Sequence, residues 1–528
     1  MILQAENFTG EIENRRTFAI ISHPDAGKTT LTEKLLLFGG AIRMAGSIKG
    51  RKTKIHAASD WMEMERQRGI SITSSVMQFS YRGHRINLLD TPGHQDFSED
   101  TYRTLTAADC ALMLIDMAKG VEAQTIKLFE VCRMQGIPIF TFMNKLDRQG
   151  KEPLDLLDEL EKVLGIGSYP MNWPAGSPPG PYGIYNRHSR QFELHRAGEK
   201  PELVSAAEQG VEHPGIKNAL DDYSYNKLRD EVKLLEAAGE AYDQDKVDKG
   251  LLTPVFFGSA ISSFGVDSFF NEFLRLAPPP ASRDSSAGPI NPASNTFSAF
   301  AFKIQANMNP AHRDRIVFLR ICSGMFKRDM PVTHVRTGKT IKLSQPQQFL
   351  AQNRNITEEA YPGDIIGLYD PGIFKVGDTL TDGETFQFNK MPRFSPEHFA
   401  RVTTKAAMKY KQFHKGLSQL AEEGAVQVFL TPGSENIILG AVGELQFEVF
   451  EYRLKAEYGV DLLIERLPYS LLRGVKGLSA AELPDVINGM AVKDREGSLY
   501  ILFENEFWYK MSLEKIPAEN LCLIEEMS

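Results

Sequence analysis

The sequence predicts three structural units in chain order: an α/β unit with a mostly parallel sheet, an antiparallel β-barrel and an α+β unit. From residue 17 to about 278, apolar strands alternate with helical patterns, as they do in βαβ units. Short strands with glycine turns continue to about residue 380, which is typical of a barrel, and helices mix with strands from Ala400 onward. At 528 residues the chain is too long for one core, so several domains are expected.

Shifts in composition place the predicted domain boundaries. Roughly a hundred residues separate Asp147 from Pro254, far more than a strand connection needs, so we expect an insert with its own structure. A segment rich in Pro, Ser, Ala and Asn follows the first unit and is interpreted as a linker. The expected domains are residues 1–280 with the insert at about 168–250, residues 296–390 for the barrel, and residues 391–528 for the α+β unit.

The first strand runs into a phosphate-binding loop. An apolar run ending at Ile21 precedes a tight turn that closes with Gly27, Lys28 and Thr29. In such a loop glycine lets backbone amides face the phosphates, lysine reaches the β and γ oxygens, and the hydroxyl can hold Mg²⁺. Position 22 is serine where the usual pattern has glycine, so the loop alone also fits an ordinary strand–turn–helix. The residues expected at the nucleotide here are Ser22, His23, Pro24, Asp25, Ala26, Gly27, Lys28, Thr29 and Thr30.

Three further apolar strands end in polar loops with matching chemistry. After one of them, Asp90 can orient the water shell of Mg²⁺. After another, Asp147 can accept from N1 and the exocyclic amine of guanine, while Lys145 packs over the base plane. After the last, a Ser-Ala turn can place a backbone amide on the guanine O6. The residues expected at the nucleotide from these loops are Asp90, Thr91, Pro92, Gly93, His94, Asn144, Lys145, Leu146, Asp147, Ser259 and Ala260.

The order and placement of the four loops carry the prediction. Each loop alone also fits a buried strand followed by a polar turn. Together, each at the carboxyl end of an apolar strand, they converge on the crevice where doubly wound sheets bind ligands. The predicted fold class is therefore an α/β P-loop GTPase domain, followed by an antiparallel β-barrel domain and an α+β domain. GTP or GDP and Mg²⁺ are the expected cofactors.

Composition narrows the environment of the protein. The formal net charge of −8 argues against a protein that coats nucleic acid in bulk, although a local basic surface stays open. Four cysteines occur without a close pair or a histidine at metal spacing, which favours a reduced, cytoplasmic protein without a zinc site. No apolar run reaches the roughly 18 residues that a membrane span needs. We expect no membrane partner and a monomer.

Longer segments resemble the translational GTPases, the ribosome-activated group that contains elongation factors Tu and G. The first three segments that carry the likeness lie in the α/β unit, and the rest are similar to the second and third domains of elongation factor G. These segments are residues 23–30, 68–72, 90–94, 301–304, 420–423 and 443–446. The resemblance implies a ribosomal partner, with contacts to ribosomal RNA and proteins.

The resemblance also implies roles in hydrolysis. His94 follows Asp-Thr-Pro-Gly, where Ras-type GTPases place a glutamine, so its imidazole is expected to orient the attacking water once the ribosome positions it. A structural role, in which His94 packs the loop, is the alternative. Switch I is expected within residues 39–75, with Ser71 as a Mg²⁺ ligand where the family usually has threonine, and with Thr73 as the alternative ligand. The expected Mg²⁺ ligands are Thr29, Ser71 and Asp90.

The chain resembles the branch of this family that acts in termination. The resemblance rests on its size, its domain order and two further segments, residues 65–79 and 393–399. After residue 468 only about 60 residues remain, too few for the two further domains of the translocase. The resemblance implies that the protein binds a ribosome still holding a class I release factor, takes up GTP, and drives that factor off before hydrolysis. Two alternatives stay open: another translational GTPase, such as a shortened translocase or a ribosomal protection factor, and a GTP-controlled binding switch without catalytic purpose.

Local basic stretches are the last feature. Arg401, Lys405 and Lys409 recur every four residues, which predicts that they share one helical face, and further basic residues follow closely. A contact to ribosomal RNA and an ordinary solvated surface are both consistent with this pattern. The same two interpretations apply to a basic group in switch I, namely Arg43, Lys49, Arg51, Lys52 and Lys54.

Overall fold

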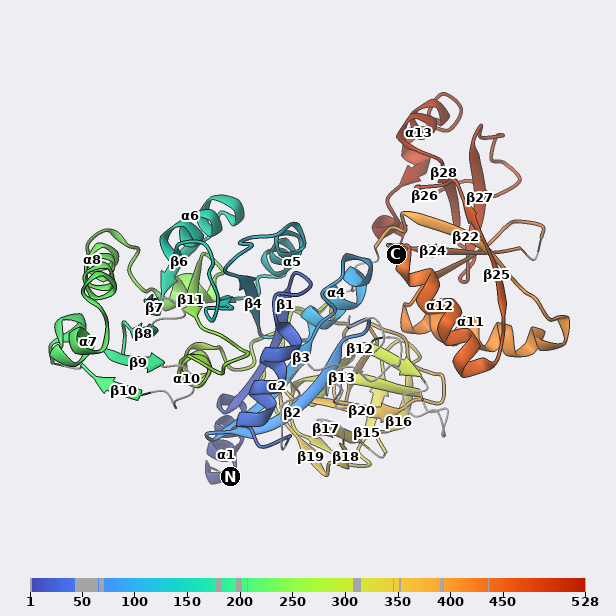
Figure 1. The fold of residues 1–528 in the computed structure, drawn as a ribbon. Coiled ribbons are helices and arrows are strands. Elements are labelled where there is room, and N and C mark those ends of the chain that lie inside the picture. The colour runs from blue at the N-terminus through green and yellow to red at the C-terminus, as the bar shows by residue number, and fades with distance from the viewer. Residues whose placement is uncertain are drawn as a thin grey trace.

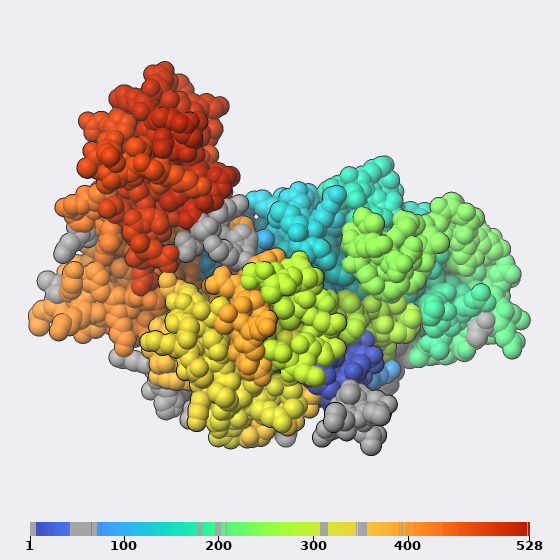
Figure 2. Space-filling view, turned by 180° about the vertical axis from the view of Figure 1, so that it is seen from behind, coloured from blue at the N-terminus to red at the C-terminus, as the bar shows by residue number. Residues whose placement is uncertain are grey.

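The structure, a computed structural model, contains three units that follow the predicted order (Figure 1). It describes residues 2–42, 65, 71–176, 182–195, 202–206, 208–306, 315–344, 346–350, 353–389, 391, 394–434 and 436–527. The basic group predicted in switch I lies outside these residues. In the space-filling view the carboxyl-terminal unit, coloured orange to red, stands up from one end of the body formed by the other two units (Figure 2).

A seven-stranded sheet forms the centre of the first unit, in the order β2-β3-β1-β4-β5-β11-β6. Every neighbouring pair is parallel except β2 with β3. The carboxyl ends of the parallel strands therefore lie along one edge of the sheet. The strands are β1 (Arg15–Ser22), β2 (Ser75–Tyr81), β3 (His84–Asp90), β4 (Cys110–Asp116), β5 (Ile139–Asn144), β6 (Gly167–Pro170) and β11 (Leu252–Phe257).

Helices cover both faces of this sheet. Alternate residues of β1 enter opposite cores, with Ala19 and Ile21 in one and Phe18 and Ile20 in the other. Burial on both faces explains why the central strands read as continuous apolar runs. One core includes side chains of α4 (Ser98–Thr106), α5 (Ala123–Met134) and α6 (Pro153–Leu164), and the other includes those of α2 (Lys28–Phe38) and α10 (Val266–Leu276).

The segment between β6 and β11 forms a second, four-stranded sheet in the order β10-β9-β8-β7. Trp173 on β7 is fully buried, donates its indole N–H to Glu231 of α8 at 2.8 Å, and packs against Phe257 of β11. The insert is thus packed on the main sheet. Its elements are β7 (Asn172–Ala175), β8 (Tyr182–Asn186), β9 (Gln191–His195), β10 (Glu202–Ser205), η2 (Gly210–Glu212), α7 (Pro214–Ala219), α8 (Asp222–Ala238) and α9 (Gln244–Asp248).

The second unit is antiparallel throughout its described pairings, with an eight-stranded sheet in the order β16-β15-β21-β12-β13-β20-β17-β18 and the small pair β14-β19. All residues of β12 and β13 are buried, because one face lines the interior of this unit and the other packs on the first unit. The strands are β12 (Ser298–Ala306), β13 (Arg315–Ser323), β14 (Phe326–Lys327), β15 (Pro331–His334), β16 (Lys339–Lys342), β17 (Gln347–Leu350), β18 (Asn353–Ile356), β19 (Glu359–Ala360), β20 (Ile365–Tyr369) and β21 (Thr379–Thr381).

The third unit is an α+β arrangement built on the sheet β25-β22-β24-β23-β27-β28-β26-β29. The predicted amphipathic helix is α12, in which Val449, Phe450 and Leu454 are buried. The elements are β22 (His398–Thr404), η3 (Ala407–Lys409), α11 (Tyr410–Glu423), β23 (Gln427–Leu430), β24 (Ile437–Ala441), α12 (Leu445–Tyr458), β25 (Leu462–Leu467), β26 (Leu471–Val475), β27 (Gly489–Asp494), β28 (Leu499–Phe503), α13 (Glu506–Ser512), η4 (Ala518–Asn520), β29 (Leu521–Cys522) and η5 (Ile524–Met527). The predicted fold class is confirmed.

One local prediction is wrong. Arg401 does not share a helical face with Lys405 and Lys409, because residues 398–404 form strand β22 and Lys409 ends the short helix η3. Burial explains the difference, since Ala400 and Val402 enter the core beside Arg401 and favour a strand. An additional helix, α1 (Ile2–Glu13), precedes β1 and was not expected. None of the described helices is long and apolar enough to cross a bilayer.

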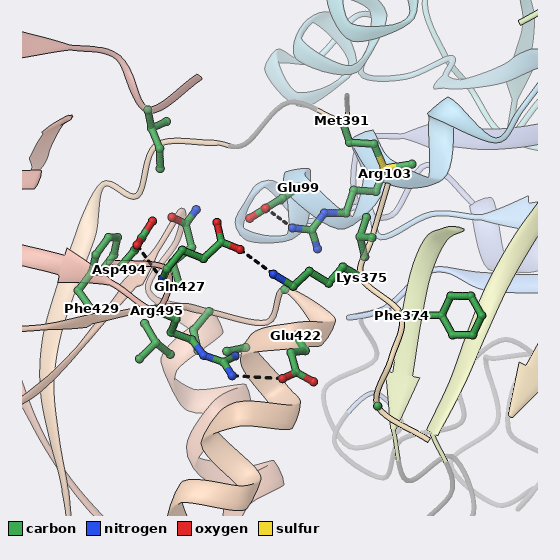
Figure 3. A pocket seen from close by; sticks show the side chains of 18 of the residues that line it. Glu99, Arg103, Phe374, Lys375, Met391, Glu422, Gln427, Phe429, Asp494 and Arg495 are labelled. Atoms are coloured by element: carbon green, nitrogen blue, oxygen red, sulfur yellow. Dashed lines mark hydrogen bonds and ion pairs between the residues drawn. The ribbon is translucent and has the colours of Figure 1, made fainter. Parts of the chain in front are cut away.

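A cavity of about 460 Å³ lies where the three units meet (Figure 3). Its wall carries charges of both signs, and these charges pair with one another. Arg103 of α4 contacts Glu99, Arg495 lies 3.2 Å from Glu422, and Lys375 contacts Glu496 at 2.7 Å. Of these three pairs, the one between Lys375 and Glu496 joins two units, the barrel and the carboxyl-terminal unit.

Candidate functional site

The phosphate loop connects β1 to α2 through a left-handed turn. Gly27 caps α2 with φ of 101°, and Asp25 has φ of 66°, a conformation that asparagine and aspartate tolerate better than most residues. The helix begins at Lys28. A Cβ on Gly27 would lie 2.2 Å from Asn144 Nδ2, so no other side chain fits there without displacing Asn144.

Lys28 and Asp90 meet at the buried end of this loop. Lys28 Nζ donates to Asp90 Oδ1 at 2.5 Å, and both side chains are almost fully buried. The other carboxylate oxygen, Oδ2, is buried and has no hydrogen-bond partner among the described residues, and the same holds for Ser22 Oγ. Thr91 Oγ1 donates to Ile20 O at 2.7 Å and fixes the start of the second loop against β1. The site thus offers a lysine and an orphaned carboxylate oxygen to a phosphate and a cation.

One side-chain amide joins three of the predicted loops. Asn144 Nδ2 donates to Ala26 O at 2.8 Å in the phosphate loop, and Asn144 Oδ1 accepts from Ala260 N at 2.9 Å in the Ser-Ala turn. Asn144 itself ends β5, so the loops after β1, β5 and β11 share a single residue. This contact holds the phosphate-binding and base-binding ends in register.

Lys145 and Asp116 form a contact that sequence reasoning missed. Lys145 has φ of 75°, and its Nζ donates to Asp25 O at 2.5 Å and to Asp116 Oδ2 at 2.6 Å. Burial alone would raise the pKa of Asp116, but hydrogen bonds from Lys145 and Ala118 hold the pKa of Asp116 below its ordinary value. Asp116 ends the apolar strand β4, and this placement was the signal that could have identified it.

The predicted base-reading residues lie beside this contact. Ser259 Oγ donates to Asp147 Oδ1 at 2.5 Å, which orients the carboxylate, and Leu146 N donates to Gly258 O at 3.1 Å. Ser259 is fully buried and Asp147 is partly exposed. The carboxylate of Asp147 is therefore held in one orientation and is partly accessible to solvent.

His94 lies at the start of the short helix η1 (Gln95–Phe97). Asp96 N donates to His94 Nδ1 at 3.3 Å, so the imidazole caps the helix, and the side chain is 36% exposed. Asp96 also accepts from Leu445 N of the third unit at 2.8 Å. A ring held through Nδ1 keeps Nε2 available for a water or a ligand.

Part of switch I lies within the described residues. Glu65 is fully buried and accepts from Ile72 N at 2.9 Å and from Thr73 N at 3.2 Å. Ile72 packs with Phe97 of η1 and with Val449 of α12 in one small apolar cluster. Residues 43–64 and 66–70 lie outside the description, and no contact that we describe decides between Ser71 and Thr73 as the metal ligand.

Comparisons with protein families agree with this architecture. The family described as "Elongation factor Tu GTP binding domain" matches residues 13–279, and "Elongation factor G domain 2" matches residues 296–383. "Class II release factor RF3, C-terminal domain" matches residues 388–512. Together with the four loops, these matches define the protein as a guanine-nucleotide-binding GTPase of translation.

Full-length relatives narrow the class. The chain is 57% identical to peptide chain release factor 3 of Symbiobacterium thermophilum over 97% of this chain and 98% of the relative. It is 54% identical to the protein of the same name from Listeria monocytogenes serovar 1/2a, again over 97% and 98%. The chain belongs to the peptide chain release factor 3 family, a group of translational GTPases that act in termination.

A solved structure supports the fold alone. A crystal structure of a protein from Thermus thermophilus superimposes with a TM-score of 0.69, covering 88% of this chain and 71% of that protein. The sequence identity between the two is 22%.

Proposed function

We propose that this protein is a ribosome-stimulated GTPase that promotes the dissociation and recycling of class I release factors after peptide release, acting as a monomer. The observation that supports it most is the convergence of four loops on one sheet edge, in a chain whose third unit matches the release-factor domain. Asn144 joins three of these loops, and the contact between Lys28 and Asp90 joins the fourth. In this proposal GTP binding and the accompanying shape change drive the class I factor off, and hydrolysis then resets the protein.

Guanine-nucleotide contacts are proposed for all four loops. The phosphate loop, residues 22–30, would hold the β and γ phosphates through backbone amides and Lys28. Asp147 would accept from the guanine base, Lys145 would cover its plane, and the Ala260 amide would face O6. In the nucleotide-bound protein Lys28 would exchange its contact with Asp90 for the phosphate oxygens, since both partners are anionic.

A Mg²⁺ site is proposed at Thr29, Ser71 and Asp90. The residues fit this ion because oxygen ligands suit Mg²⁺, and because Asp90 Oδ2 is buried without a partner among the described residues. When bound, the ion would neutralise charge on the phosphate oxygens and order the water shell that Asp90 faces. Thr73 remains the alternative to Ser71.

His94 is proposed as the residue that orients the attacking water. Its imidazole is held through Nδ1 at the start of η1 and is partly exposed, so Nε2 can reach a water when the ribosome reshapes the loop. The contacts described above hold the imidazole through Nδ1 and not through Nε2. In this proposal the ribosome supplies the arrangement that fixes Nε2 beside the attacking water.

A basic ledge on the third unit is proposed to contact ribosomal RNA. From residue 398 to residue 421 the chain contains no acidic residue, and the segment carries five lysines and arginines. Met408 is 97% exposed, and the rings of Tyr410 and His414 lie tilted against each other with their centroids 4.2 Å apart. Lysines with neighbouring rings suit phosphates and unstacked bases. The basic residues of the ledge are Arg401, Lys405, Lys409, Lys411 and Lys415.

The test is His94→Ala on terminated ribosomes that carry a class I release factor. GTP binding should persist, because the imidazole makes no ground-state contact in this proposal. Stimulated hydrolysis should fall by at least about 10²-fold, while displacement of the class I factor should survive for one round. His188→Ala, an exposed histidine of the insert, is the matched control and should behave as the unmutated protein. Normal hydrolysis without any recycling by the unmutated protein would contradict the release-factor role.

Base recognition has its own test. Asp147→Asn should exchange a guanine preference for a xanthine preference, because the amide presents a donor where the carboxylate accepted twice. Loss of a charged hydrogen bond costs about 1.5–3 kcal/mol, which corresponds to roughly 10- to 150-fold weaker GTP binding. Nucleotide affinity measured by titration of GTP and xanthosine triphosphate decides the matter, and unchanged GTP affinity would remove the assignment of Asp147.

A further inference from the structure

One buried lysine of the barrel reaches the first unit. Lys303 lies on β12 and is 5% exposed. The pairing of β12 with β13 shifts register between Ala301 and Lys303, so a bulge falls immediately before the lysine. Bulges re-aim side chains and are common next to functional sites. Here the re-aimed side chain leaves the barrel and enters the first unit.

The lysine contacts two segments of that unit at once. Lys303 Nζ donates to Ser74 O at 2.5 Å and lies 3.5 Å from Asp100 Oδ2. The same carboxylate oxygen accepts from Ser74 N at 2.5 Å and from Ser74 Oγ at 2.6 Å. Thr104 Oγ1 donates to Ser74 Oγ at 2.7 Å and adds a second residue of α4. The carbonyl of Ser74 is thus bonded to Lys303, and its amide and hydroxyl are bonded to residues of α4.

The cluster depends on the charge of Lys303. Burial alone would raise the pKa of Asp100, but the Lys303 ammonium and the hydrogen bonds from Ser74 hold that pKa below its ordinary value. Asp100 is therefore ionised at neutral pH, and its charge is balanced from the barrel. Removal of the ammonium would leave a partly buried carboxylate without its nearest cation and a backbone carbonyl without its donor.

The two contacted segments are the end of switch I and the helix that follows the loop after β3; this loop contains His94 and is called switch II below. Ser74 closes the segment that contains Ser71 and Thr73, the candidate metal ligands. Asp100 and Thr104 belong to α4, which follows η1 and His94 without an intervening loop. A shift of the Lys303 side chain therefore moves the end of switch I and the base of switch II together.

We propose that Lys303 is a positioning residue for GTP hydrolysis, which acts through Ser74 and Asp100 on Ser71 and His94. This rests on the proposed function, because it assigns to the barrel a part in the hydrolysis that the ribosome stimulates. If Lys303 only stabilised the contact between the barrel and the first unit, its substitution would lower the stability of the protein and leave kcat in the folded protein unchanged.

The experiment uses Lys303→Met in the full-length protein, since methionine keeps most of the length and loses the charge. GTP affinity without ribosomes and the KM for terminated ribosomes should change by less than about 3-fold, whereas kcat for stimulated hydrolysis should fall about 10-fold or more. Lys327→Met, an exposed lysine on the same barrel, is the matched control and should keep the unmutated kcat. An unchanged kcat in Lys303→Met would overturn the proposal.

A second variant separates positioning from folding. Lys303→Met combined with Asp100→Asn removes both charges, so the buried-charge penalty should disappear and the melting temperature should recover. The kcat should stay low, because the bond to Ser74 O is still missing. Recovery of kcat together with the melting temperature would show a purely structural lysine and overturn the proposal. Absence of stimulated hydrolysis in the unmutated protein would instead overturn the proposed function.

Discussion

Two joints connect the units of this molecule, one between the first unit and the barrel and one at the carboxyl-terminal unit, and their ion pairs differ in how deeply they are buried. Between the first unit and the barrel, Asp109 is completely buried and lies 2.6 Å from Arg320 and 3.0 Å from Arg283. A second buried pair joins Arg15 to Asp364 at 2.9 Å. Apart from Arg283, whose side chain is 22% exposed, these groups are buried, so their geometry is fixed by their partners.

The carboxyl-terminal unit is attached differently. Lys375 of the barrel and Glu496 of this unit pair at 2.7 Å with about half of each side chain exposed. Switch II contacts this unit through a hydrogen bond from Leu445 N to Asp96, beside a small apolar cluster. This joint also has a buried part, where Arg315 of β13 pairs with Glu422 and where Glu423 accepts from Ala306 N at 2.9 Å.

The difference teaches which part of the protein can move. Breaking a buried pair leaves an uncompensated charge and is costly, whereas exposed pairs contribute little and are screened by salt. The first unit and the barrel should therefore behave as one body. The exposed part of the carboxyl-terminal joint can separate at small cost, whereas its buried part, where Arg315 pairs with Glu422, resists separation. The contact between Asp96 and Leu445 couples the position of this unit to switch II.

The largest effect is expected at the buried joint. Asp109→Asn should lower the free energy of unfolding by about 3–5 kcal/mol, because two guanidinium groups lose their counter-charge inside the protein. Urea unfolding followed by circular dichroism measures this change. Asp230→Asn, which breaks a surface pair of α8, should shift the free energy by less than about 0.5 kcal/mol. A loss below about 1 kcal/mol in Asp109→Asn would erase the contrast between the joints.

An intermediate effect is expected where the barrel holds the loop of Lys375. Asp378 accepts from Lys375 N at 2.7 Å and contacts Arg336 and His334. Burial alone would raise the pKa of Asp378, but these partners lower it from 3.8 to about 2. The stabilisation is therefore complete above the unfolded value of 3.8 and is lost as the pH falls towards 2, with a size of about 2 kcal/mol.

The measurement for Asp378 is the unfolding free energy between about pH 5 and about pH 2. Asp378→Asn should be less stable than the unmutated protein at the upper pH, and the two should converge at the acid end, because the amide has no proton to bind. Asp329→Asn removes an exposed carboxylate of the same barrel and should run parallel to the unmutated protein. A constant difference at every pH would refute the titration of Asp378.

The smallest effect is expected at the exposed joint. Glu496→Gln should reduce the free energy of unfolding by less than about 1 kcal/mol at low salt, because the pair with Lys375 is open to water. In about 1 M salt the difference should vanish, since the screening length falls to about 3 Å. Thermal unfolding at two salt concentrations tests this, and a salt-independent loss would place the pair among the buried contacts.

The fold class and the residues of the four loops could be predicted from local sequence for a physical reason. Parallel strands covered on both faces read as apolar runs, and the turns after them hold the polar residues, so Lys28, Asp90 and Asn144 could be placed from their neighbours alone. The structure brings three of the loops together through Asn144 and the fourth through the contact between Lys28 and Asp90, while the roles of their residues stay proposals. Asp116 followed the same rule and was overlooked.

Other features lay beyond local pattern. Lys303 and Asp100 are 203 residues apart, and a bulge decides where the lysine points, so no spacing rule finds the pair. For Arg401 the error was one of period: a four-residue repeat of basic residues also occurs in a strand followed by a turn, and the buried Ala400 and Val402 decided for the strand.

The close approach of Gly27 to Asn144 limits how this protein can vary. The nitrogen that a Cβ at position 27 would strike is the one that donates to Ala26 O. Asn144 Oδ1 also accepts from Ala260 N, so a side chain at position 27 would disturb the loops proposed to bind the phosphates and the base at the same time. We therefore expect that no substitution at position 27 changes the base preference and leaves phosphate binding intact, because both proposed functions depend on Asn144.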